Sequence, residues 1–93
     1  MIELKEFVAK PCNSRTAFEF IPAKEYNIEL EKTAKKLREK NVFVEIETPY
    51  LLMLKLENHD LTFFKSGKIV VKGTKEKKEA TKIAQLLIER INS

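Results

Sequence analysis

Apolar and polar residues alternate along the second half of the chain in a pattern typical of β-strands. Residues 61–65 and 69–72 are rich in aromatic and β-branched side chains, and they flank a short Ser66-Gly67-Lys68 segment. Gly67 supplies the positive φ that a tight connection requires. The pattern therefore predicts a β-hairpin over residues 61–72.

This hairpin has two candidate registers. A two-residue turn at Ser66-Gly67 places Phe64 beside Ile69, whereas a three-residue loop ending at Lys68 pairs Phe63 with Val71 and Phe64 with Val70. We prefer the second register because it separates one apolar face from one mixed face. The apolar face then holds Leu61, Phe63, Ile69 and Val71, and the mixed face holds Thr62, Phe64, Val70 and Lys72.

Three upstream segments also alternate, and each has one apolar face. The first predicted strand is Arg15–Ile21, with Phe18 and Phe20 on one face. The second is Val42–Glu47, in which Val42, Val44 and Ile46 point inward and Phe43, Glu45 and Glu47 point outward. The third is Tyr50–Glu57, with Leu52, Leu54 and Leu56 inward. Pro22, Thr48-Pro49 and a turn at residues 58–60 separate these segments. Residues 2–9 alternate weakly and form either a strand or an N-terminal arm.

Two segments have the periodicity of amphipathic helices. Asn27 is a candidate N-cap for the first helix, and Thr74 is one for the second. The apolar stripes are Leu30, Ala34 and Leu37 in the first helix, and Ala80, Ile83, Ala84, Leu87 and Ile91 in the second. On the first helix we expect Lys32, Lys35, Lys36 and Lys40 to face water, and Asn41 to end it.

This order of elements predicts a single α+β domain over residues 1–93, with residues 1–14 as an arm or strand. Each strand has one apolar face and the helices have matching stripes, which favours an antiparallel sheet with both helices on one side. The other side then exposes Phe43, Leu51, Met53, Phe64 and Val70. Either a ligand or partner uses this open face, or the N-terminal arm covers it.

Composition and charge narrow the functional classes only slightly. The chain has 93 residues, 34% of them charged, and a net charge of +4, which permits a polyanionic partner without requiring one. The many Lys, Glu and Ile residues are typical of thermophilic proteins. Lysines near the hairpin and the second helix either contact phosphates or belong to a solvated Lys/Glu surface. They are Lys65, Lys68, Lys72, Lys75, Lys77 and Lys78.

Candidate catalytic and metal-binding residues are sparse. His59 lies beside Asp60 without partners at metal-ligand or acid–base spacing, and the sequence has no Gly-rich phosphate loop or serine elbow. Cys12 is the only cysteine, which suits a reducing cytoplasm. The N-terminus lacks a basic signal-peptide region, and the longest apolar run, Tyr50–Leu54, is too short to span a membrane. We therefore predict a cytoplasmic protein without enzymatic activity, metal, cofactor or membrane contact. A small-molecule pocket between the second helix and the sheet is a weaker hypothesis.

Residues 61–91 resemble one repeat of the TATA-box-binding protein family. The segment 64–73, Phe-Lys-Ser-Gly-Lys-Ile-Val-Val-Lys-Gly, is similar to the family's hairpin and following strand, and residues 74–91 fit its long second helix. Residues 50–57 overlay the preceding strand, whereas residues 42–47 form a strand additional to the family pattern. The same hairpin and helix also occur in the similar N-terminal domain of type III ribonuclease H. The resemblance implies a curved antiparallel sheet with two helices on one face.

In that family the open sheet face binds nucleic acid in a widened minor groove and inserts phenylalanines between base steps. Carried over by position, the nucleic-acid-binding residues here are Thr62, Phe64, Ser66, Lys68, Val70 and Lys72, with Phe64 at an intercalating position. The family uses two repeats, so a homodimer of this chain would supply the second for DNA or RNA. Glu45 and Glu47 on the same face repel phosphate. They favour the alternative of a protein-interaction or oligomerisation module, in which they pair with Lys68 or Lys72 of a partner.

Overall fold

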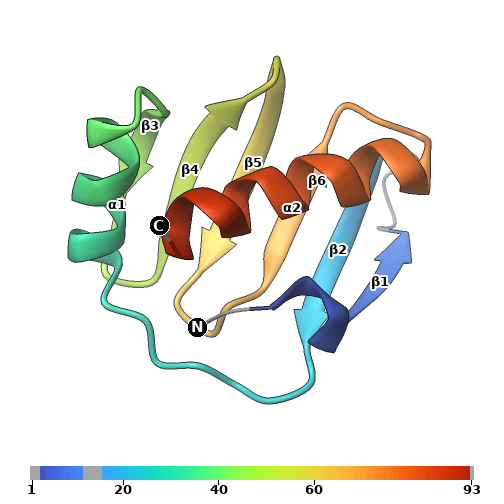
Figure 1. Ribbon diagram of the computed structural model, residues 1–93, viewed down its shortest axis with the longest axis horizontal. Helices are drawn as coiled ribbons and strands as arrows, with labels where there is room; N and C mark the ends of the chain where they lie inside the picture. The colour runs from blue at the N-terminus through green and yellow to red at the C-terminus, as the bar shows by residue number, and fades with distance from the viewer. Residues whose placement is uncertain (1–2, 12–15, 93) are drawn as a thin grey trace.

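The computed structural model describes residues 3–11 and 16–92, which form a six-stranded antiparallel sheet and two α-helices (Figure 1). The elements are η1 (Leu4–Glu6), β1 (Phe7–Pro11), β2 (Ala17–Pro22), α1 (Leu30–Glu39), β3 (Phe43–Glu47), β4 (Leu51–Leu56), β5 (His59–Phe64), β6 (Ile69–Lys72) and α2 (Lys77–Asn92). The strand order is β1-β2-β6-β5-β4-β3. Both helices lie on one face of the sheet, α2 over β6 and β2 and α1 over β3. The predicted fold class is confirmed.

The core lies between the helices and the strand positions that point toward them. Phe63, Ile69 and Val71 are fully buried, and so is Leu87 of α2. The predicted helical stripes are buried except for Ile91, which is partly buried, and α2 also buries Ile88. Burial of one large apolar side chain contributes about 1.5–3 kcal/mol. The alternation of apolar residues therefore determines which sheet face the helices cover.

The β5–β6 hairpin has the predicted faces but a different register. Leu61 is opposite Val71, Thr62 is opposite Val70, and Phe63 is opposite Ile69. The predicted pairs Phe63–Val71 and Phe64–Val70 are therefore wrong. The loop has three residues as expected, but it spans 65–67, and Gly67 has the predicted positive φ of 98°. The predicted assignment of residues to the two faces is nevertheless correct, because the partner of each residue shifts by two positions and such a shift preserves the alternation.

The β4–β5 turn is shorter than predicted. Leu56 is opposite His59, so only Glu57 and Asn58 form the turn, both with positive φ (52° and 64°). This geometry is that of a two-residue type I′ turn, which matches the twist of the flanking strands. His59 and Asp60 therefore belong to β5 and not to the predicted turn.

A β-bulge in β3 reverses the predicted faces at its end. Val44 is opposite Leu54, but Ile46 rather than Glu45 is opposite Met53, and Glu47 is opposite Leu52. The extra residue moves Glu47 to the helix-covered side, where its Oε1 lies 2.9 Å from Nη1 of Arg38. Ile46 moves to the open face and is 43% exposed. The predictions that Ile46 points inward and Glu47 outward are therefore wrong.

The N-terminal segment extends the sheet. β1 pairs with β2 at the sheet edge, so it does not lie across the open face. Cys12 and Arg15 lie outside the described residues.

The first helix departs from its prediction at its start and at one lysine. It begins at Leu30 instead of directly after Asn27, and its N-cap Glu29 makes no side-chain cap bond. Asn41 follows the helix with a positive φ of 63°. Lys36 does not face water as predicted, because its Nζ donates to the carbonyl oxygen of Ile91 at 2.8 Å. This bond ties α1 to the C-terminal turn of α2, where cations are favourable.

We expect Phe63→Ala to lower the free energy of unfolding by about 3–5 kcal/mol, because Phe63 is fully buried in the core on the helix-covered side of the sheet. Phe43→Ala is the matched control: Phe43 is 61% exposed, so its loss changes stability by about 0.5 kcal/mol or less. Urea unfolding followed by far-UV circular dichroism measures both values. Equal losses of unfolding free energy in the two variants would contradict a core that lies on only one face of the sheet.

Candidate nucleic-acid interface

The open face is a continuous surface that all six strands contribute to. The strand registers align one residue from each strand across it, in the order Lys10, Glu19, Val70, Thr62, Met53 and Ile46. Val70 and Thr62 at its centre are only 9% and 7% exposed, although both α-helices of the described residues lie on the other face. Their neighbours on adjacent strands therefore shield them, and the centre of the face is uncharged and tightly packed.

Apolar side chains near both edges of this face are more accessible. Phe43 is 61% exposed on β3, and Val8 is 55% exposed on β1. Phe64 is half-buried at the end of β5, opposite Leu51 of β4. Exposed apolar groups on an uncovered sheet face are typical of interaction surfaces.

Phe64 is held by the hairpin loop. Its backbone N–H donates to the carbonyl oxygen of Lys68, and its own carbonyl accepts from the N–H of Gly67, both at 2.9 Å. The loop in turn docks on the segment before α1, because the N–H of Tyr26 donates to the carbonyl of Ser66 at 2.9 Å. A Cβ on Gly67 would come within 2.8 Å of Cδ2 of Tyr26, so only glycine fits there. The aromatic ring therefore projects from a rigid position.

The structure brings four of the six predicted binding residues together. Val70 and Thr62 are opposite one another, Phe64 follows on β5, and Lys68 lies over the Phe64 ring with Nζ 5.2 Å from its centroid. Lys72 is exposed at the other end of β6, and Ser66 is half-buried within the loop. Lys68 is not free for a ligand, because its Nζ lies 2.9 Å from Oε1 of Glu19.

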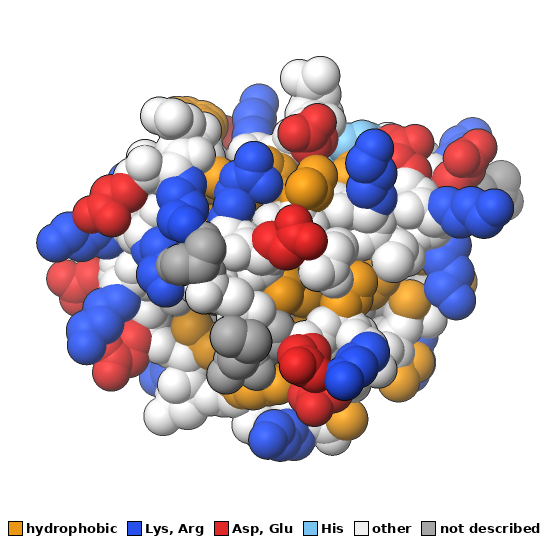
Figure 2. Space-filling view, viewed as in Figure 1, with side chains coloured by type: hydrophobic (Ala, Val, Ile, Leu, Met, Phe, Trp, Pro, Cys, Tyr) orange, Lys and Arg blue, Asp and Glu red, His pale blue; other side chains and the backbone are white. Residues whose placement is uncertain are grey.

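The predicted lysine cluster is divided into two groups. Lys65 and Lys68 lie at the hairpin loop, whereas Lys72 is the last residue of β6 and the lysines that follow lie beyond that end of the strand. On the side where α2 lies, basic and acidic side chains are intermixed (Figure 2). These six lysines therefore do not form one basic patch.

His59 has a role that the sequence did not reveal. Its Nδ1 lies 2.9 Å from the carbonyl oxygen of Lys72, and its Nε2 lies 2.8 Å from Oε1 of Glu79. The side chain is only 14% exposed. His59 therefore links β5, β6 and the first turn of α2. Within residues 3–11 and 16–92, no group of three His, Cys, Asp or Glu residues is placed to hold a metal.

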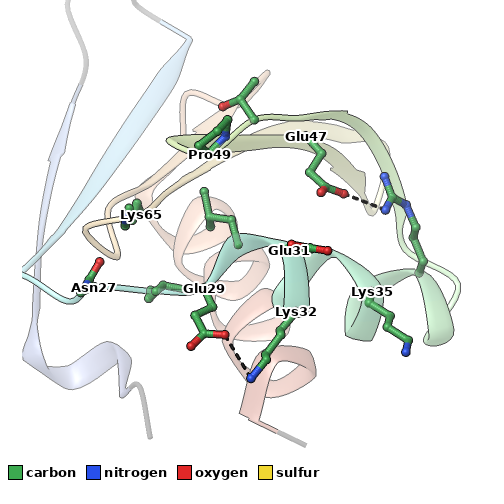
Figure 3. Close-up of a pocket in the computed structure, with 12 residues that line it drawn as sticks. Asn27, Glu29, Glu31, Lys32, Lys35, Glu47, Pro49 and Lys65 are labelled. Atoms are coloured by element: carbon green, nitrogen blue, oxygen red, sulfur yellow. Dashed lines mark hydrogen bonds and ion pairs between the residues drawn. The ribbon is translucent and has the colours of Figure 1, made fainter.

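A hollow of about 950 Å³ lies on the helix-covered side, between the start of α1 and the β3–β4 turn (Figure 3). Its lining mixes acidic and basic side chains, and two ion pairs lie there: Glu29 pairs with Lys32 at 3.1 Å, and Glu47 with Arg38 at 2.9 Å. Core side chains pack between α2 and the sheet, where a small-molecule pocket was the weaker hypothesis, and a hollow of about 180 Å³ remains at the edge of this space, beside His59, Glu79 and Ile83. The open face is therefore the stronger candidate site.

These features define a class of protein: an α+β repeat whose helices cover one face of a curved antiparallel sheet and leave the other face open. Residues 23–93 match the family model of transcription factor TFIID, or TATA-binding protein (TBP), and the chain belongs to this family. The match begins before α1 and includes β3, the strand that sequence analysis regarded as additional. Searches of curated proteins and of solved structures gave no match. Neither helix, as far as the described residues extend, has the length and apolarity to cross a bilayer.

The environment of the Tyr26 hydroxyl predicts an alkaline transition in stability. Desolvation raises the pKa of Tyr26 above its ordinary value of 10.0, and the Glu6 carboxylate adds to this by accepting a hydrogen bond from the hydroxyl and by its charge. The folded state therefore prefers the neutral phenol, so stability falls as pH rises above about 10 through the raised pKa.

In a Tyr50→Phe variant, Tyr26 is the only tyrosine left, and its ionisation is measurable by ultraviolet absorbance. We expect the pKa of Tyr26 to lie above 10.0 and to fall when Glu6→Gln is added. An unchanged titration of Tyr26 after Glu6→Gln would contradict the hydrogen bond between the Tyr26 hydroxyl and the Glu6 carboxylate.

Proposed function

We propose that this protein is a non-catalytic module that binds nucleic acid, DNA or RNA, through Thr62, Phe64, Ser66, Lys68, Val70 and Lys72 on the open face. The observation that carries this proposal is the rigidly held Phe64 beside Leu51 on a sheet face that no helix covers. An apolar side chain in this position is suited to act as a wedge between base steps. Membership of the TBP family supports the same use of this face.

The distribution of charge on this face suits a minor groove. Its centre, at Val70 and Thr62, has no charge and would meet base edges. Lys72 and Lys10 are exposed nearer its margins, where phosphates of the two strands would lie. The net charge of +4 favours association with a polyanion in general.

We propose further that two copies act together, joined along β1. The carbonyl of Glu6 accepts from the N–H of Ala23 at 2.9 Å, so Glu6, Val8 and Lys10 direct their backbone groups toward β2. Phe7 and Ala9 therefore direct theirs outward, away from the sheet. The opposite edge is less suited to pairing, because β3 has a bulge and two glutamates. Pairing of β1 with its copy would extend the open face across both protomers.

Sedimentation of wild type and Ala9→Pro tests this arrangement. The substitution removes an outward N–H that β2 does not use, so we expect the dimer to dissociate while the monomer keeps its fold. Ala9→Ser keeps the N–H and is the control. A monomeric wild type would contradict the proposed homodimer. A dimer that persists in the Ala9→Pro variant would contradict pairing of the two copies along β1.

A second candidate function is a protein-interaction or oligomerisation module that uses the same face. The observation that favours it is the pairing of charges there: Lys68 with Glu19 at 2.9 Å, and Lys55 with Asp60 at 3.9 Å. Paired lysines attract phosphate less strongly, whereas exposed Phe43 and Ile46 suit a protein partner. Glu47 does not contribute as sequence analysis proposed, because it pairs with Arg38.

Phe64→Glu separates the two candidates. If the face binds nucleic acid, we expect affinity for a labelled duplex, hybrid or single strand at low salt to fall about ten- to a hundredfold, because an apolar wedge or stacking group is lost and a negative charge is added. Gln85→Glu on α2 makes the same change in net charge on the helix-covered side and should change affinity much less.

No binding by the wild type to any of these ligands at low salt would contradict nucleic-acid binding. If the wild type also sediments as a dimer that Phe64→Glu dissociates, the result would select the oligomerisation module.

A further inference from the structure

We propose that Glu19 is a built-in competitor for phosphate at Lys68, and that it sets how tightly the open face binds nucleic acid. The inference rests on the proposed nucleic-acid function. It goes beyond that function because it assigns a regulatory role to a side chain outside the binding residues named above.

The position of Glu19 on the open face is well defined. It lies on β2, opposite Lys10 of β1 and Val70 of β6. Its Oε1 lies 2.9 Å from Nζ of Lys68, and the two side chains are 27% and 32% exposed. A carboxylate thus lies next to the apolar centre, where a nucleic acid would lie against the face.

The same contact also blocks Phe64. Nζ of Lys68 lies 5.2 Å from the centroid of the Phe64 ring, so the ammonium group occupies one face of the aromatic side chain while it pairs with Glu19. A cation in this position is attracted by the ring as well as by the carboxylate. A base that stacks on this face of the ring must therefore displace Lys68, and its phosphate must replace Glu19 as the partner of Lys68.

Electrostatic repulsion adds to this competition. A phosphate bound to Lys68 would lie within a few ångströms of the displaced carboxylate, well inside the Debye length of about 8 Å at physiological ionic strength. In the wild type, Lys68 therefore contributes little net attraction to phosphate. Removal of the Glu19 charge frees the ammonium group and removes the repulsion at the same site.

The Lys55–Asp60 pair provides a matched comparison. It lies on neighbouring strands of the same sheet, but its atoms are 3.9 Å apart and the side chains are 55% and 58% exposed. Exposed pairs with this geometry contribute little. Asp60→Asn removes one negative charge, as Glu19→Gln does, without freeing a lysine that lies over Phe64.

The test is a salt series of duplex binding by fluorescence anisotropy with wild type, Glu19→Gln, Asp60→Asn, Lys68→Gln and the double variant Glu19→Gln/Lys68→Gln. We expect Glu19→Gln to bind about three- to tenfold more tightly than wild type. The slope of log affinity against log salt should steepen by about 0.9, because one more phosphate is neutralised. Asp60→Asn should change affinity less than about twofold.

The double variant decides whether the effect acts through Lys68. We expect it to bind no more tightly than Lys68→Gln, apart from the small change that Asp60→Asn measures. Equal gains in Glu19→Gln and Asp60→Asn, or a gain that persists without Lys68, would overturn the inference and leave nucleic-acid binding intact. Absence of binding by every variant at the lowest salt would instead overturn the proposed function. Thermal unfolding checks each variant, and Glu19→Ser replaces Glu19→Gln if the latter does not fold.

Discussion

The structure depends on the burial of one face of the sheet against two helices. Phe63, Ile69 and Val71 are fully buried on the helix-covered face, and Leu37 of α1 is equally buried. Because successive side chains of a strand point to opposite faces, this packing also dictates what the other face presents. Thr62 and Phe64 point outward because Phe63 points inward. The candidate interface is therefore a consequence of the core and needs no separate scaffold.

The open face combines an apolar centre with charges that are already partnered. Lys68 pairs with Glu19 and lies over Phe64, so its charge, its partner and the aromatic ring form one coupled group. Under the proposed function, a ligand would have to replace the carboxylate of Glu19, which would discriminate against ligands that lack a suitable anion. Family membership makes nucleic acid the natural ligand class to consider, and the paired charges make the energetics of Lys68 the central question.

The helix-covered side is stabilised by contacts between residues distant in sequence. Lys36 donates to the carbonyl of Ile91, and His59 lies between the carbonyl of Lys72 and the carboxylate of Glu79. These contacts join α1 to α2 and the β5–β6 pair to α2. They fix the helices relative to the sheet, whereas the hairpin loop that positions Phe64 is held by backbone bonds from Tyr26 and Ile28, which precede α1.

The sequence by itself determined the class of fold and the sidedness of its elements, because the apolar periods of 2.0 and 3.6 residues depend only on local geometry. It identified Phe64, Val70 and Thr62 as residues of one face, even though the predicted hairpin register was wrong, since a shift of two residues preserves that face. Only the tertiary structure decided the β3 bulge that exchanges Ile46 and Glu47, the edge position of β1, and the partners of Lys68 and His59. These features arise from contacts between distant segments, which no local pattern of residues encodes.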